Sequence, residues 1–174
     1  MTPFLHDVLV FATKAHTDVR QVRKYTGEPY IVHPIEVMMI TSLAGSVTED
    51  MLAAALLHDV VEDTEKTLDD IYKLFGISIT AFVEELTEPE TKGKRATRKA
   101  AEAERLSKVS DEAQTIKIAD SISNIRTIKK YDPEFAKVYL PEKAALLKVL
   151  TRGDRALLSM AWDLIPDDIV PSKE

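Results

Sequence analysis

The sequence contains no cysteine. Disulfide bonds, zinc–thiolate sites and catalysis by a thiol are therefore excluded, and the composition suits a reducing compartment, so we expect a cytoplasmic location. Long apolar runs are also missing, since the longest covers residues 51–57 and a membrane-spanning helix needs about 20 apolar residues. Residues 1–7 lack a basic start followed by an apolar stretch, so we expect no secretory signal and no membrane partner.

Basic residues are too few to balance the acids: 23 Lys and Arg face 29 Asp and Glu, for a formal net charge of −6. Non-specific binding of nucleic acid relies on a basic surface that neutralises phosphates, so we expect no nucleic-acid partner. A small anionic ligand held by a local basic cluster is not excluded. With 174 residues, 45% of them hydrophobic, the chain can bury a core without a structural metal.

Patterns typical of β-strands are also missing, and apolar residues recur at helical spacing nearly throughout. No repeat, low-complexity stretch or linker divides the chain. We therefore expect one all-α domain over residues 1–174, with about eight to ten helices. The expected helices cover roughly residues 3–16, 35–43, 49–63, 68–75, 78–86, 96–108, 111–130, 133–150 and 155–164.

The expected helix over residues 49–63 changes character half-way. Its first half, residues 51–57, is apolar on every side, which predicts a helix that is buried all round. Four ionisable residues then share an arc of roughly 140°: His58, Asp59, Glu62 and Asp63. Such a group at the end of a buried helix is costly unless a cation compensates it. The alternative is that the helix emerges into solvent here and these are surface charges.

The expected helix over residues 111–130 has a similar pattern. Isoleucines 118, 122 and 125 form one apolar face. The opposite face holds four polar residues at helical spacing: Asp120, Ser123, Asn124 and Thr127. Periodicity alone favours an ordinary solvated face, but Ala113 and Ile116 also fall toward that side, so the face is not expected to lie wholly in water.

His33 gains significance from its combination with these residues. It precedes Pro34, which favours an extended conformation, so we expect His33 at a helix N-terminus with its side chain free to turn inward. Together with His58, Asp59 and Asp120 it makes a set of two imidazoles and two carboxylates. Such a set suits manganese, iron or zinc, with open positions for water. We expect no role for His6 on an exposed face, and a packing or capping role for His16.

Three segments resemble, in order, the motifs of the RelA/SpoT-type alarmone hydrolases, a group within the HD-domain metal-dependent phosphohydrolases. They are residues 15–34 (AHTDVRQVRKYTGEPYIVHP), 54–64 (AALLHDVVEDT) and 116–127 (IKIADSISNIRT). The resemblance runs from about residue 4 to residue 150. Three such motifs in order are far more specific than any one of them.

The resemblance implies an HD-domain helical bundle that acts as a guanosine-3′,5′-bis(diphosphate) 3′-pyrophosphohydrolase-like enzyme. Its substrate would be (p)ppGpp or (p)ppApp, and its products GDP, GTP or the adenine equivalent plus pyrophosphate. The implied ligands of one Mn²⁺ per chain are His33, His58, Asp59 and Asp120. The implied catalytic pair, which handles the attacking water and the proton transfer, is Glu62 and Asp63. The implied substrate-binding residues are Arg23, Lys24, Asn124 and Thr127.

Two departures from the family pattern bear on substrate choice. The spacer between His16 and Gln21 is two residues longer than usual, and Ser121 stands where many members have a basic residue. A basic segment lies in an expected loop and comprises Lys92, Lys94, Arg95, Arg98 and Lys99. It is either a solvated loop or a flexible arm that neutralises substrate phosphates.

Two other functions remain open. The chain could be another HD-domain nucleotide phosphohydrolase of the 5′-nucleotidase type, although the motif over residues 23–30 and the Glu62–Asp63 pair argue against this. It could also be a non-catalytic nucleotide-binding module, although every implied ligand and both acids are present. The sequence does not distinguish a guanine from an adenine alarmone.

Overall fold

A computed structural model describes residues 1–89 and 92–169, and the elements within these ranges are helices, as predicted. Their bounds are α1 Pro3–Asp18, α2 Val32–Thr41, α3 Glu49–Leu57, α4 Val60–Asp63, α5 Leu68–Phe75, α6 Ile77–Leu86, α7 Arg95–Leu106, α8 Asp111–Tyr131, α9 Pro133–Leu147 and α10 Arg155–Trp162. An isolated antiparallel bridge joins Val22 to Pro29. Three of the helices begin at a threonine cap, Thr2, Thr48 or Thr67, whose hydroxyl oxygen accepts a backbone N–H of the first turn.

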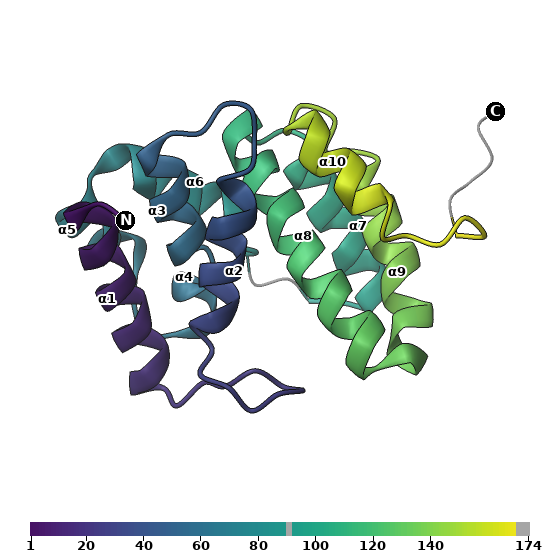
Figure 1. The fold of residues 1–174 in the computed structure, drawn as a ribbon, viewed down its shortest axis with the longest axis horizontal. Helices are drawn as coiled ribbons and strands as arrows, with labels where there is room; N and C mark the ends of the chain where they lie inside the picture. Colours follow the sequence, from purple (N-terminus) through teal and green to yellow (C-terminus); the bar gives the residue numbers. More distant parts are fainter. Residues whose placement is uncertain (90–91, 170–174) are drawn as a thin grey trace.

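Helix α8 runs through the middle of the molecule, with α1–α6 to one side and α7, α9 and α10 to the other (Figure 1). It contacts α2, α3, α6, α9 and α10. Ile118, Ile122 and Ile125 are fully buried, but so is Ser123, and Asp120 is only 4% exposed. The solvated reading of the polar face is therefore wrong, because α2 and α3 cover it. Within the described ranges no helix, α8 included, is both long and apolar enough to cross a membrane.

Helix α3 is buried as predicted, but it ends at Leu57 instead of continuing to Asp63. The imidazole Nδ1 of His58 lies 2.8 Å from the carbonyl oxygen of Ala55, which is the acceptor that the Asp59 N–H would use in a continuing helix. Asp59 leaves helical geometry (φ −100°, ψ −5°), and α4 starts at Val60. The side chain of His58 therefore competes with the backbone and interrupts the helix.

Helix α2 begins at Val32, before Pro34, so the expected extended conformation at His33 is wrong. The first-turn N–H groups of a helix have no intrahelical acceptor, so a proline there removes no helical hydrogen bond. The backbone N–H of His33 instead donates to the Tyr30 carbonyl at 3.0 Å. His33 is consequently anchored within the first helical turn and is 2% exposed.

The longer spacer before Gln21 forms the C-terminal cap of α1. Arg20 has a φ of +56°, its N–H donates to the Thr17 carbonyl at 2.9 Å, and the N–H of Gln21 donates to the His16 carbonyl at 3.0 Å. These two bonds are those of a Schellman motif, in which the left-handed position is usually glycine. The motif turns the chain back so that Gln21 lies beside His16.

Arg20→Gly should therefore stabilise the protein by about 1 kcal/mol, because glycine adopts the left-handed conformation without the steric cost of an arginine side chain. Urea unfolding followed by circular dichroism should show a higher midpoint with an unchanged slope. The matched control is Val19→Gly, at the neighbouring position with a φ of −93°, which should lower the midpoint. A loss of stability in both variants would contradict this account of the cap.

Candidate metal centre and active site

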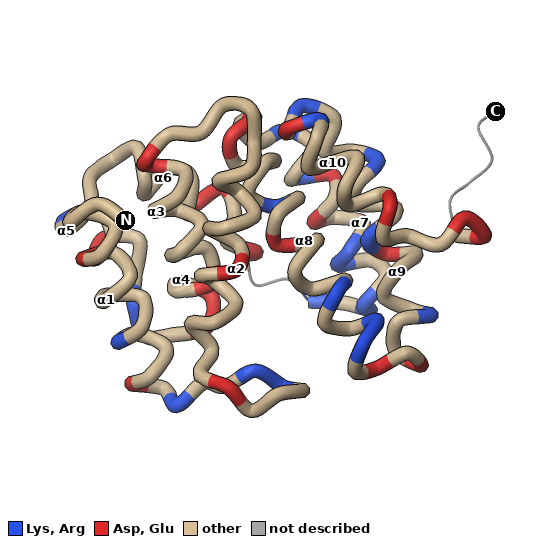
Figure 2. Tube along the Cα trace, viewed as in Figure 1, with Lys and Arg blue, Asp and Glu red and all other residues tan. Residues whose placement is uncertain are grey.

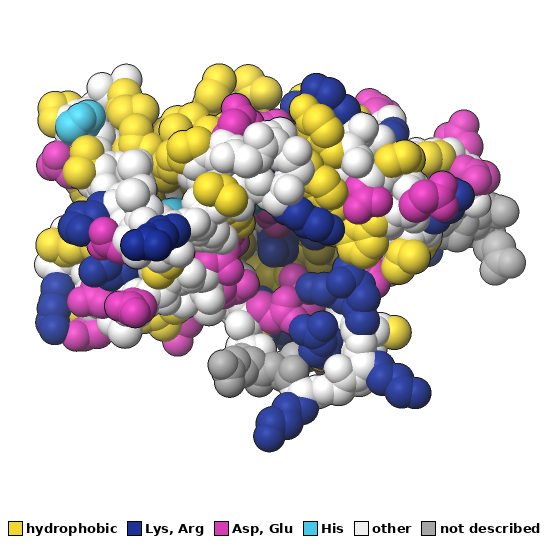
Figure 3. All heavy atoms as spheres, turned by 90° about the horizontal axis from the view of Figure 1, so that it is seen from below, with side chains coloured by type: hydrophobic (Ala, Val, Ile, Leu, Met, Phe, Trp, Pro, Cys, Tyr) yellow, Lys and Arg dark blue, Asp and Glu magenta, His cyan; other side chains and the backbone are white. Residues whose placement is uncertain are grey.

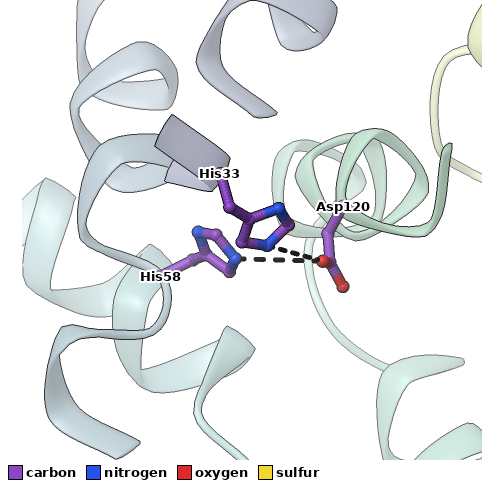
Figure 4. Close-up of side chains that lie close together, drawn as sticks. All are labelled: His33, His58 and Asp120. Carbon is purple, nitrogen blue, oxygen red and sulfur yellow. Dashed lines mark ion pairs between the residues drawn. The ribbon is translucent and has the colours of Figure 1, made fainter. Parts of the chain in front are cut away.

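The structure brings two imidazoles and a carboxylate together from three elements. His33 comes from α2, His58 from the end of α3 and Asp120 from α8, and the three side chains point toward one another (Figure 4). Asp120 Oδ1 lies 3.3 Å from His33 Nε2 and 3.9 Å from His58 Nε2. One ligand atom from each residue lies within 4.8 Å of the other two, and all three residues are buried.

Asp59, the fourth predicted ligand, lies beside this group. Its Oδ2 is 3.1 Å from His58 Nε2 and 3.6 Å from His33 Nε2, so it faces both imidazoles. The same oxygen accepts a hydrogen bond of 2.6 Å from the hydroxyl of Tyr30. The four residues that the sequence suggests as metal ligands therefore lie together. His33, His58 and Asp120 form the compact group, and Asp59 lies at its edge.

The hydrogen bond of His58 to the Ala55 carbonyl decides which imidazole nitrogen faces the site. A carbonyl oxygen only accepts, so Nδ1 must carry the proton and the neutral ring has its lone pair on Nε2. Nε2 is buried and makes no well-formed hydrogen bond with any described residue, although the carboxylate of Asp59 is near. A buried nitrogen with an unused lone pair is suited to metal ligation.

His33 is oriented in the same way by a short relay. Its Nδ1 lies 2.9 Å from Ser123 Oγ, and the Ser123 hydroxyl donates to Glu36 Oε2 at 2.8 Å. Because the hydroxyl proton goes to Glu36, the oxygen of Ser123 accepts from Nδ1–H of His33. The lone pair of His33 Nε2 therefore points toward Asp59 and Asp120. Such partners behind an imidazole fix its orientation and increase its basicity.

The charges of the site call for a cation. Burial alone would lower the pKa of His58, but the carboxylates of Asp59 and Asp120 outweigh it and raise this pKa to about 9. Burial alone would raise the pKa of Asp59, but the imidazoles of His58 and His33 hold it below its usual range. Once His58 has lost its proton, two imidazole lone pairs and two ionised carboxylates fit a divalent transition metal, so we conclude that these residues can hold one.

Two neighbours on α8 fix the carboxylate of Asp120. Asn124 donates from Nδ2 to Oδ1 at 2.5 Å, and Lys117 Nζ lies 3.2 Å from Oδ2. Burial would raise the pKa of Asp120, but the nearby charge of Lys117 outweighs it and holds the pKa well below its usual value. Asp120 is therefore ionised at neutral pH. Asn124, which we expected to face the substrate, lines the cavity and also orients this carboxylate.

Glu62 and Asp63 lie at the mouth of the site and are held by groups outside it. The carboxylate of Glu62 accepts the backbone N–H of Glu88. Asp63 Oδ2 accepts from Gln21 Nε2 at 2.8 Å, and Gln21 Oε1 lies 2.6 Å from His16 Nδ1. His16, which is 1% exposed, thus supports Asp63 through Gln21. Desolvation within the site raises the pKa of both Glu62 and Asp63, a direction that suits groups that exchange protons with a substrate.

Two cavities meet at Glu62, Asp63 and Glu88. The outer one has a volume of about 690 Å³ and extends to Lys92 and Arg98. The inner one, of about 340 Å³, reaches Asp59 and Asp120 and continues between α7, α8 and α9. Seen from below, the surface is hollowed, and acidic and basic side chains gather around the hollow (Figure 3). A phosphorylated small molecule can therefore reach the carboxylates of Asp59 and Asp120 from solvent.

The residues predicted to bind the nucleotide are not all brought to the cavities. The guanidinium carbon of Arg23 lies over the ring of Tyr30, 5.8 Å from the ring centroid. Arg23 also donates to Thr127 Oγ1 at 3.4 Å, so these three residues lie together at the side of the site. Lys24 instead points away, with its side chain 75% exposed and its Nζ 3.9 Å from Asp132. Arg23 and Thr127 are thus placed to meet a ligand that extends past Tyr30, whereas Lys24 is not.

The basic segment is partly helical, because α7 begins at Arg95, one residue before the expected start, and so contains three of the five basic residues. Arg95 makes two bonds of 2.8 Å to the carboxylate of Glu142. Lys99 Nζ lies 3.1 Å from Glu88 and 2.5 Å from Glu102. Basic positions gather along α7 and the adjoining parts of α8 and α9 (Figure 2). Two of the five basic residues are thus bound to carboxylates of the site wall.

No role was predicted from the sequence for several residues that contact the predicted site residues or line the cavity: Gln21, Tyr30, Glu36, Lys117, Ser123 and Lys143. Glu36 and Ser123 each follow a predicted ligand by three positions on a helix, which was a usable signal. Lysines on helices are usually solvated, so nothing in the sequence distinguished Lys117 and Lys143 from ordinary surface lysines. Ser121, by contrast, is fully buried and donates to the Lys117 carbonyl at 2.8 Å, away from the cavities. His6 is exposed, as expected.

Comparison with known proteins decides the family. The HD domain profile matches residues 9–146. The chain belongs to the HD domain family. The guanosine-3′,5′-bis(diphosphate) 3′-pyrophosphohydrolase MESH1 of Danio rerio is 34% identical over 134 residues, which are 76% of this chain and 73% of that protein. MESH1 of Homo sapiens is 38% identical over 125 residues, 71% and 69% of the two chains.

A solved structure supports the same relationship. It is described as a metazoan ortholog of SpoT that hydrolyzes ppGpp and plays a role in starvation responses. It aligns with a TM-score of 0.86 and 30% sequence identity over 94% of each chain. The predicted resemblance and the HD-domain helical fold are therefore confirmed. The extension of a single domain over all of residues 1–174 stays a prediction.

Ser123→Ala should weaken metal binding to this HD-domain protein by about 10- to 100-fold, the usual effect of losing a partner behind a ligating histidine. Calorimetric titration of the metal-free protein with Mn²⁺ measures the affinity directly. Ser159→Ala, on α10, is a control on a helix that carries no ligand. An unchanged affinity in Ser123→Ala would show that the relay to Glu36 does not orient His33.

Metal binding should also release a proton at pH 7.5. The pKa of His58 is raised from 6.5 to about 9, so its imidazole is protonated at this pH and must lose a proton to become a ligand. The release should fall toward zero above about pH 10, and the affinity should rise with pH. Titrations in two buffers of different ionisation enthalpy count the protons. Equal heats in both buffers at pH 7.5 would contradict the raised pKa.

Proposed function

We propose that the protein hydrolyses the 3′-pyrophosphate of alarmone nucleotides. One observation carries the proposal: the Nε2 atoms of His33 and His58 face the carboxylates of Asp59 and Asp120 in a buried cluster beside a cavity. The relatives named above support it, because their names state a guanosine-3′,5′-bis(diphosphate) 3′-pyrophosphohydrolase. The substrate would be (p)ppGpp, with (p)ppApp as the adenine counterpart.

A divalent metal held by His33, His58, Asp59 and Asp120 would supply a Lewis acid that polarises a phosphoryl oxygen and lowers the pKa of water. We propose Mn²⁺, one ion per chain. Asn124 and Lys117 keep the carboxylate of Asp120 ionised and oriented.

Glu62 and Asp63 perform the proton transfers in this proposal. A carboxylate of the pair accepts a proton from water as its oxygen attacks the phosphorus bound to the 3′ oxygen. The bond between that phosphorus and the 3′ oxygen breaks, and the same carboxylic acid returns the proton to the leaving 3′ oxygen. Pyrophosphate and a nucleoside 5′-di- or triphosphate are the products. The hydrogen bonds of Gln21 to Asp63 and of the Glu88 N–H to Glu62 hold the pair in place.

Arg23 and Thr127 position the nucleoside. The guanidinium of Arg23 is already stacked on Tyr30 and bonded to Thr127, so little conformational freedom is lost when a base packs against it. In this arrangement the nucleoside lies on the side of Tyr30 and the phosphates reach inward to Asp120. Lys24, which points to Asp132, reaches the nucleotide only by changing its rotamer. The cytoplasmic location stays a prediction.

Chromatography of ppGpp, pppGpp and their adenine counterparts, incubated with enzyme and Mn²⁺, tests the proposal. Pyrophosphate with GDP or GTP is the expected product. Release of orthophosphate from nucleoside 5′-monophosphates, without pyrophosphate from alarmones, would favour a 5′-nucleotidase instead. Tight binding of an alarmone without turnover would indicate a non-catalytic module.

Glu62→Gln should lower kcat by about 10²- to 10⁴-fold, the usual contribution of an acid–base group, while Mn²⁺ still binds. Asp120→Ala should lose metal binding and activity together. Glu65→Gln is the matched control, because Glu65 is an exposed acid three positions further along the chain. Calorimetric Mn²⁺ titration beside steady-state kinetics separates the two effects. A fully active Glu62→Gln enzyme would remove Glu62 from the mechanism.

A further inference from the structure

The inner cavity contains four basic side chains, and three of them are paired with carboxylates. Arg95 is bonded to Glu142. Lys99 lies within ion-pair distance of both Glu88 and Glu102. The third, Lys117, lies 3.2 Å from Asp120 Oδ2 and 3.7 Å from Glu102 Oε1. An incoming anion can use any of these cations only by weakening an existing ion pair.

Lys143 on α9 is the exception. It lines the same cavity, yet no carboxylate oxygen among residues 1–89 and 92–169 lies within 4.0 Å of its Nζ. Its surroundings are the ring of Tyr139, with Nζ 5.2 Å from the ring centroid, and the charges of Asp120 and Lys117 across the cavity. The side chain is largely removed from solvent. A desolvated ammonium without a counter-ion is costly unless a ligand supplies one.

The position of Lys143 defines which part of a ligand it can meet. Helices α8 and α9 are joined at Asp132 and pack side by side (Figure 1). Asp120 lies twelve positions before this junction and Lys143 eleven positions after it, so at about 1.5 Å per residue the two are level. Thr127, which is bonded to Arg23, lies only five positions before the junction. Along the two helices, Asp120 and Lys143 thus lie at one level, further from the junction than Thr127 and its partner Arg23.

We infer that Lys143 binds the terminal phosphate of the 3′-diphosphate and so selects a diphosphate over a monophosphate at the 3′ position. This inference rests on the proposed function. With the nucleoside at Arg23 and the reacting phosphorus at Asp120, the second phosphate of the 3′ group extends to the α9 wall of the cavity, at the level of Asp120. Lys143 is the cation there that can bind it without breaking an ion pair.

The proposal gives Lys143 a role in binding and not in proton transfer. A lysine ammonium acts as a compact positive charge with three donors, which suits a terminal phosphate with several free oxygens. The same contact holds the pyrophosphate product until it leaves. Loss of Lys143 should therefore weaken pyrophosphate binding and leave orthophosphate binding nearly unchanged, because orthophosphate can occupy the position near Asp120 alone.

Inhibition of the Mn²⁺-loaded enzyme by inorganic pyrophosphate and by orthophosphate tests this inference. In Lys143→Met, we expect the inhibition constant for pyrophosphate to rise by about 10- to 100-fold, as for the loss of one charged hydrogen bond, and kcat/KM for ppGpp to fall similarly. The constant for orthophosphate should change by less than about threefold. Lys143→Arg should retain most of the pyrophosphate affinity. Lys148→Met, an exposed lysine near the end of the same helix, is the matched control.

Several outcomes would overturn the inference. Equal increases of the inhibition constants for pyrophosphate and orthophosphate in Lys143→Met would show that Lys143 acts on the whole site. Weaker Mn²⁺ binding in this variant would show the same. A larger fall of kcat/KM for pppGpp than for ppGpp in Lys143→Met would place Lys143 at the 5′-phosphates. Lys143→Gln gives the same comparison if the methionine variant fails to fold. If the wild-type enzyme hydrolyses no alarmone, the proposed function fails. Calorimetric binding of pyrophosphate and orthophosphate to the Mn²⁺-loaded wild-type and Lys143→Met proteins then decides the Lys143 inference separately.

Discussion

The burial of Asp120 is the constraint on which the rest of the site depends. An ionised carboxylate on a helix that neighbours cover on both sides is unfavourable unless nearby groups compensate it. Lys117 and Asn124 do so from one turn away on the same helix, and the His58 imidazolium, which stays protonated until a metal binds, does so from the end of α3. Because part of this compensation comes from another element, α3 must pack against α8 in one register. Fold and site are thus fixed by the same contacts.

The need to place the imidazoles beside the buried carboxylate of Asp120 also explains the irregular backbone around them. His58 takes the carbonyl that would continue α3, at a cost of about one helical hydrogen bond, or about 1 kcal/mol. In return its tautomer is fixed with Nε2 toward the cluster, and the break lets Asp59 turn beside it. His33 achieves the same result without a break, because the first turn of α2 tolerates Pro34 and Ser123 supplies the partner. Two different local arrangements therefore direct the Nε2 atom of each ring toward Asp59 and Asp120.

Much of this was visible in the sequence, because it depends on local rules. The helical class, the threonine caps and the buried α3 follow from periodicity and capping chemistry, and the motifs named the His and Asp residues that the structure brings together. The break at His58 could not be predicted, since it depends on a side chain that competes with the backbone. The burial of the polar side of α8 could not be predicted either, because periodicity shows which residues share a helix face but not which other elements cover that face. Lys143 gave no signal, since nothing local distinguishes it from a solvated lysine.

The charge distribution explains how an acidic protein can accept a polyanion. The net charge of −6 includes the acids of the site itself, of which a divalent metal offsets two charges. Most cations along the inner cavity are held by Glu88, Glu102, Glu142 or Asp120, so they add little net attraction. Attraction must therefore come from the metal and from the few cations without partners. Selectivity among phosphorylated ligands then depends on the distance between these centres, which the side-by-side packing of α8 and α9 sets.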